Sequence, residues 1–158
     1  MKKIQLISLI TLVSSLLFSF ALSAQTVQSQ KQAEAAVQFR QAILQLVRSN
    51  MGPMGAMAKG EIPYDAQLMI KNSQRIEQLG LMMEDYFRPD TREFDVETAA
   101  LDKIWENEAD FYKKAQDMVT AAINVQEIAT AGAQDEYRKA IGSLGATCKA
   151  CHDDYKAD

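Results

Sequence analysis

Residues 148–152 read Cys-Lys-Ala-Cys-His, and this stretch decides how the rest of the chain must be arranged. On a helix, Cys148, Cys151 and His152 stand at i, i+3 and i+4, so their side chains share one face. Two cysteines at this spacing, followed directly by histidine, are typical of covalent haem attachment. Each sulfur adds to one haem vinyl group, and the imidazole binds the iron. Because the chain has two cysteines and one histidine, all inside this motif, we predict one haem c.

Two other kinds of site share part of this pattern. A structural zinc site needs four ligands, so a carboxylate such as Asp153 would have to join the cysteines and the histidine. A dithiol redox site would place the two cysteines beside a βαβ pattern, and no such pattern surrounds them. A helical dithiol or metal-binding module without haem is therefore the alternative to the haem protein.

The first 24 residues have the organisation of a secretory signal peptide. Lys2 and Lys3 form a short basic segment, residues 4–21 are uncharged and mostly apolar, and residues 21–24 are mostly small, as a cleavage site requires. Cleavage would leave a mature domain of residues 25–158 in the periplasm, with no membrane attachment. An uncleaved membrane anchor is the alternative, because the apolar run is long.

The charge balance argues against nucleic acid as a partner. The chain has 21 acidic and 17 basic side chains, a formal net charge of −4, and removal of Lys2 and Lys3 would make it more negative. Such a surface repels phosphate backbones. The sequence also lacks a Ser/His/Asp set and a second histidine for acid–base work, so we expect a protein that is not an enzyme.

Apolar residues recur at helical spacing, and no run alternates with period two, which indicates an all-α fold. The breaks are Pro53, Pro63, Pro89 and Gly132. Asp65 is a plausible N-cap, and the glycines and prolines of residues 51–63 favour a connection rather than a helix. The predicted helices, which would form an antiparallel four-helix bundle, span residues 28–51, 66–87, 99–131 and 134–156.

The predicted first helix has two unusual features. Its apolar residues fill about half of the helix circumference, which is wider than one bundle face needs. A homodimer through the first two helices would bury the additional apolar surface. The alternative is that this surface is buried within one subunit. Arg40 lies in the middle of this apolar sector. A buried guanidinium needs an anionic partner, which a haem propionate would supply; alternatively, its head reaches water while its stem packs.

The chain resembles the cytochrome c′ family of four-helix-bundle cytochromes. The resemblance is carried by the C-terminal haem motif with Tyr155, and by the segments 39–41, 59–65 and 104–105. It implies that Arg40 and Gln41 lie at the haem propionates and that the loop before Trp105, including Thr98, passes the haem edge. Relatives often carry arginine four residues after the histidine; Lys156 stands there, keeping the charge without the guanidinium fork.

The resemblance also implies the state of the iron. Low-spin relatives have methionine four residues after the early arginine, and this chain has Leu44, which cannot bind iron. We therefore expect five-coordinate, high-spin iron that binds NO and CO, with a role in NO buffering, NO detoxification or redox chemistry. Met51, Met54 and Met57 remain possible ligands after rearrangement. The alternative is an electron-transfer cytochrome of an anaerobic respiratory chain; the sequence does not identify its redox partner.

Overall fold

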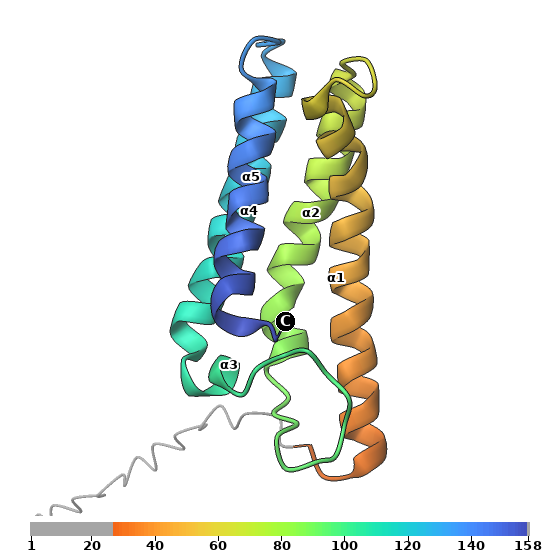
Figure 1. Cartoon of the computed structure of the whole chain (residues 1–158), viewed down its shortest axis with the longest axis vertical. Coiled ribbons are helices and arrows are strands. Elements are labelled where there is room, and N and C mark those ends of the chain that lie inside the picture. Colours follow the sequence, from red (N-terminus) through yellow and green to blue (C-terminus); the bar gives the residue numbers. More distant parts are fainter. Residues whose placement is uncertain (1–26, 158) are drawn as a thin grey trace, which may run out of the picture.

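The computed structural model describes residues 27–157, so the predicted signal peptide or anchor at residues 1–24 lies outside the described part. Four long helices run alternately up and down the long axis of the molecule (Figure 1). This arrangement confirms the predicted all-α antiparallel bundle. No helix among the described residues is long and apolar enough to cross a membrane. The long helices are α1 (Gln30–Lys59), α2 (Ala66–Phe87), α4 (Glu108–Thr130) and α5 (Tyr137–Tyr155), and a short α3 (Lys103–Glu106) precedes α4.

Local sequence explains three of the helix ends. Ser29 and Asp65 are N-caps, whose side chains accept hydrogen bonds from the backbone N–H groups of Gln32 (3.3 Å) and Leu68 (3.0 Å). Each bond satisfies an amide that has no partner inside the helix. Gly60 ends α1 in the left-handed region with φ of 79°, a conformation that glycine adopts without a steric penalty. The N-cap predicted at Asp65 is therefore confirmed.

The prediction that residues 51–63 form a connection is wrong for most of that segment. Helix α1 continues through Pro53 to Lys59. Proline removes one helical hydrogen bond, but Met54 and Met57 lie in this turn with no exposed surface. The burial of two large side chains in the core outweighs the weak local preference for a loop.

The predicted third helix is interrupted. Residues 99–102 are not helical, and Asn107, with φ of −133° and ψ of 49°, separates α3 from α4. The backbone of residues 99–101 instead pairs with the end of α5. Leu101 N–H donates to Tyr155 O (3.0 Å), and Ala157 N–H donates to Ala99 O (2.9 Å). These bonds join residues far apart in the sequence, so helical periodicity alone does not reveal them.

The bundle is packed unevenly. Helices α2 and α4 approach closely at Gly80, where an added Cβ would lie 2.7 Å from Val119 Cγ2. Glycine at this position therefore permits the contact. Between α1 and α5, by contrast, the interior opens into a cavity of about 710 Å³.

Candidate functional site

The cavity between α1 and α5 is lined by all eight residues that the sequence predicts as haem-site residues. Most of its exposed wall is apolar. Its size lies within the range of small-molecule and cofactor sites. The site residues predicted from the sequence that line it are Arg40, Gln41, Leu44, Thr98, Cys148, Cys151, His152 and Lys156.

Helix α5 supplies the wall that carries the two cysteines and the histidine. Both cysteines are free thiols and are half-buried. Burial raises the pKa of the Cys151 thiol to about 11, and it raises the pKa of Cys148 as well. A dithiol redox site works through an accessible thiolate with a lowered pKa, so this environment does not suit that alternative.

The geometry does not suit a zinc site either. Among residues 27–157, no three histidine, cysteine, aspartate or glutamate side chains are arranged to hold a metal ion. Asp153, the carboxylate considered as a fourth ligand, pairs instead with Lys149.

Arg40 on α1 is buried, with 3% of its surface exposed, so the alternative in which its head reaches water is wrong. Its Nη2 donates to Thr91 Oγ1 at 2.8 Å. Its guanidinium carbon lies 5.1 Å from the ring centre of Trp105 and 5.7 Å from that of Phe87. Burial lowers the pKa of Arg40 to about 10, partly offset by Asp90. The group is therefore still charged at neutral pH.

Two donors of this buried cation have no protein partner. Arg40 Nε and Nη1 make no hydrogen bond within the described structure. Leaving charged donors buried and unsatisfied is costly, and Arg40 lines the cavity. A propionate beside Arg40 in the cavity would supply the missing anionic partner, because a guanidinium pairs strongly with a carboxylate.

Thr98, in the α2–α3 connection (residues 88–102), and Lys156 both line the cavity. Lys156 lies beyond the end of α5 in an extended conformation, with φ of −120° and ψ of 131°, and it forms an antiparallel bridge with Ala100. The prediction that the fourth helix includes Lys156 is therefore wrong. Its side chain still lines the cavity, and its ammonium donates to Ala157 O at 2.9 Å.

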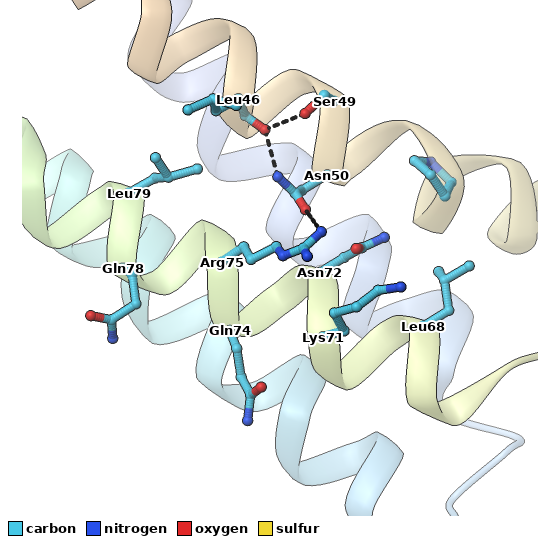
Figure 2. A pocket seen from close by; sticks show the side chains of 11 residues that line it. Leu46, Ser49, Asn50, Leu68, Lys71, Asn72, Gln74, Arg75, Gln78 and Leu79 are labelled. Atoms are coloured by element: carbon cyan, nitrogen blue, oxygen red, sulfur yellow. Dashed lines mark hydrogen bonds between the residues drawn. The ribbon is translucent and has the colours of Figure 1, made fainter.

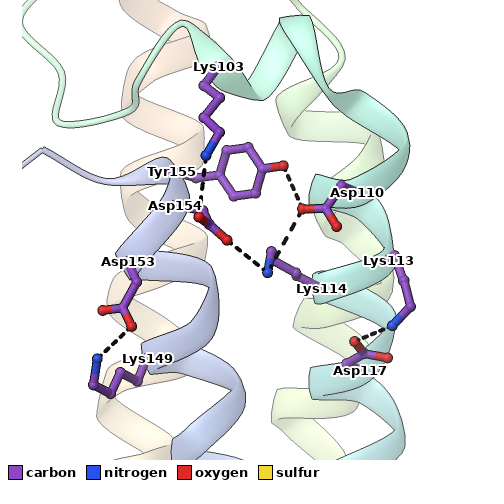
Figure 3. A network of polar contacts seen from close by, with 9 residues as sticks. All are labelled: Lys103, Asp110, Lys113, Lys114, Asp117, Lys149, Asp153, Asp154 and Tyr155. Carbon is purple, nitrogen blue, oxygen red and sulfur yellow. Dashed lines mark hydrogen bonds and ion pairs between the residues drawn. The ribbon is translucent and has the colours of Figure 1, made fainter.

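A polar network fastens the end of α5 to its neighbours (Figure 3). Lys114 on α4 bridges Asp154 (3.0 Å) and Asp110 (3.8 Å), and Lys103 on α3 also reaches Asp154 at 3.3 Å. The hydroxyl of the buried Tyr155 donates to Asp110 Oδ2 at 2.7 Å. These contacts flank His152 in the sequence and so restrict the turn that presents its imidazole.

Sequence reasoning did not assign the residues of the remaining walls to the site. Helical spacing of apolar residues indicates burial, and it does not distinguish a core position from the wall of a cavity. Of the methionines considered as ligands, Met51 lines the cavity, whereas Met54 and Met57 are fully buried in the core. The apolar residues on the walls from α2, α3 and α4 are Met83, Phe87, Ile104, Phe111, Ala115 and Met118.

The residues fit a covalently bound haem. Two thiols and an imidazole share one wall, the surrounding surface is apolar, and the cation of Arg40, which lacks a full set of protein partners, borders the cavity. A flat macrocycle with an apolar body and two carboxylates requires this combination of groups.

Comparison with known proteins agrees with this fit. Residues 35–156 match the family model described as Cytochrome C'. The relative named cytochrome c' from Alcaligenes xylosoxydans xylosoxydans is 37% identical over 123 residues, covering 78% of this chain and 94% of the relative.

Solved structures give the same result. Cytochrome c prime from Shewanella frigidimarina superposes with a TM-score of 0.73 at 32% identity, over 80% of this chain and 97% of that one. A variant of cytochrome c prime from Alcaligenes xylosoxidans, solved as its nitric oxide complex, has a TM-score of 0.71 at 34% identity, over 80% and 96% of the two chains.

Proposed function

The chain belongs to the cytochrome c′ family, and from this premise we propose that it binds NO and CO at a five-coordinate, high-spin haem iron. Its role would be NO buffering or detoxification in the periplasm, without catalytic turnover. The cofactor of this family is haem c, which supplies an iron that changes oxidation state and accepts a diatomic ligand.

The protein's own residues would hold and surround this group. Cys148 and Cys151 would form the two thioethers, and the His152 imidazole would be the axial ligand. Arg40 would neutralise a propionate, while Gln41, Thr98 and Lys156 would lie along the haem edge. The polar network around Asp154 would keep α5 in register with α4 while the ligand binds.

The observation that carries the proposal is the place of Leu44. It lies one turn after Arg40 on α1, on the wall of the same cavity that receives the cysteines and the histidine from α5. Leucine neither binds iron nor donates a hydrogen bond, so a face covered by Leu44 stays open to ligands that need no polar assistance. The nitric oxide complex solved for a relative supports the same choice of ligand.

The test is the absorption spectrum of the purified full-length product, with and without CO after reduction. A broad high-spin spectrum that changes on CO addition is the expected result. A sharp six-coordinate spectrum that ignores CO would contradict the proposal. In His152→Ala the thioethers can still form, so we expect the haem to remain attached while the normal high-spin spectrum is lost.

One observation favours a second candidate, a six-coordinate electron-transfer cytochrome. Met51, Met83 and Met118 all line the cavity, and a thioether can bind haem iron. One of these side chains packs against α2, because Met118 Cε lies 3.1 Å from where a Cβ on Gly80 would be. We therefore rank this candidate second, and the same spectrum decides between the two.

We also propose a homodimer through α1 and α2. Phe39, which is 56% exposed, packs edge-on against Tyr86 with ring centres 6.0 Å apart, and Leu81 and Met82 on α2 are exposed as well. Exposed large apolar side chains on two adjacent helices suit an isologous contact. Sedimentation equilibrium of the wild type and of Phe39→Glu should give a dimer and a weakened dimer; a wild-type monomer would rule this out.

A further inference from the structure

A second cavity, of about 720 Å³, lies between α1 and α2 on the outside of the bundle (Figure 2). It shares no lining residue with the haem cavity. Its polar lining comes from amides, a hydroxyl and two cations, and no carboxylate side chain borders it. Leu46, Leu68 and Leu79 add an apolar part. The cavity thus combines positive charge with an apolar surface in a chain whose formal net charge is −4.

The two cations of this cavity are not neutralised by the protein. Lys71 and Arg75 stand four residues apart on α2, and neither forms an ion pair with any residue of the described chain. The one polar contact of Arg75 is a long bond of 3.5 Å from its Nη1 to Asn50 Oδ1. Like charges at this spacing repel each other, so an anion between them would relieve the repulsion.

Asn72 adds a hydrogen-bonding amide to the same part of the cavity. It lines the cavity beside the two cations, and 5% of the residue's surface is exposed. Figure 2 shows Lys71, Asn72 and Arg75 leaving α2 on the side of α1, whereas Gln74 and Gln78 point away from α1. The donors of Asn72 and the two cations therefore serve one space.

We propose that the cavity between α1 and α2 binds an organic oxyanion, a carboxylate or phosphate monoester with a small apolar body. Arg75 and Lys71 would hold the charged head, because a guanidinium fork matches the oxygens of both groups. Asn72 would donate its amide N–H to the same head. Leu46, Leu68 and Leu79 would cover the apolar body of the ligand.

This site is distinct from the surface proposed for dimerisation. Phe39 and Tyr86 mark that surface at one end of the α1–α2 pair. Asn50 and Arg75, which meet across the two helices at the cavity, lie further along both helices, toward the α1–α2 connection. A second copy of the chain could also cover this cavity, and the experiment below distinguishes a second copy from a small ligand.

The experiment is isothermal titration of the haem-containing protein at constant ionic strength with phenyl phosphate, benzoate and benzylamine. We expect saturable binding of phenyl phosphate, of benzoate, or of both, and none of benzylamine. The comparison of the two anions identifies the preferred head group. Loss of one charge-assisted contact in Lys71→Gln or Arg75→Gln should weaken the binding about tenfold. Lys139→Gln, which removes an exposed lysine of α5, should leave it unchanged.

Asn72→Leu keeps the test interpretable if a charge variant folds poorly. It should weaken anion binding, because it removes the amide donor. The unfolding transition of the ligand-free protein should stay close to that of the wild type, because leucine nearly conserves the side-chain volume. Absence of saturable heat with both anions overturns the proposal, as does equal affinity in wild type and the Lys71→Gln/Arg75→Gln double variant. Concentration-dependent protection of residues 68–79 from hydrogen exchange would assign the cavity to a second copy and also overturn it.

Discussion

Arg40 on α1 and Thr91 in the α2–α3 connection are both almost fully buried, with 3% and 2% of their surfaces exposed, and a 2.8 Å hydrogen bond joins them. This bond uses one terminal nitrogen of the guanidinium and leaves Nε and Nη1 without protein partners. Thr91 therefore orients Arg40, a role that nothing in the sequence indicates.

Thr91→Val should leave Arg40 Nη2 without its hydrogen-bond partner. We expect the free energy of unfolding of the haem protein to fall by about 1–3 kcal/mol, and the reduction potential to shift as Arg40 loses its orientation toward the propionate. Thr91→Ser retains the hydroxyl and should restore the potential. Urea titration and spectroelectrochemistry measure the two effects. An unchanged potential in Thr91→Val would mean that Thr91 serves packing alone.

Arg40→Ala should destabilise the protein more than the loss of an exposed arginine does. The change removes the stacking on Trp105 and Phe87 and leaves a propionate without its cation, for an expected loss of about 1–3 kcal/mol. Arg88→Ala is the matched control, because Arg88 makes only an exposed pair with Glu84, at 2.8 Å. Such pairs contribute about 0–1 kcal/mol. Equal losses in the two variants would refute the propionate role.

Leu44 variants test which residue covers the open face of the iron. Leu44→Ala should speed CO association by making room, and Leu44→Met should convert the centre to six-coordinate and low-spin. Because Leu44 is 39% exposed, the alanine variant should lose less than the roughly 2–5 kcal/mol typical of a fully buried leucine. Stopped-flow CO binding and the ferric spectrum are the measurements. Wild-type rates and spin state in both variants would assign the distal face to another side chain.

Asp90 provides a prediction of pH dependence. The hydrogen bond from the Arg92 side chain holds the pKa of Asp90 below its usual 3.8. A depressed carboxyl pKa stabilises the folded state above the unfolded-state value, and this stabilisation is lost as pH falls through the folded-state value. Asp90→Asn should therefore lower stability at neutral pH and flatten its decline below pH 3.8. Parallel stability curves for wild type and variant in acid would disprove this contribution.

The sequence predicted the bundle well where helical signals are local. Asp65 caps α2 as expected, because an N-cap bond spans three residues. The predicted connection at Pro53 was wrong, because the burial of Met54 and Met57 keeps this segment helical although proline is a weak helix former. The prediction was also wrong at Lys156, which leaves α5 to pair with Ala100, since a contact between distant segments has no periodic signature.

The same distinction applies to the site. Cys148, Cys151 and His152 follow from one short motif, and Arg40 stands out because a charge lies in an apolar sector. Thr91 carries no comparable signal, because a threonine in a polar connection is ordinary. Nothing in the sequence shows that its hydroxyl meets a guanidinium on another helix.

The α2–α3 connection has a consequence for the order in which the molecule is completed. Thr91, near its start, bonds to Arg40, a residue that precedes the connection in the chain. Ala99 and Leu101, near its end, bond to Ala157 and Tyr155, which are synthesised after the connection. Until residues 155–157 are present, Ala99 and Leu101 lack these partners. The turn that carries His152 is therefore tied to the α2–α3 connection only by residues that follow the haem motif.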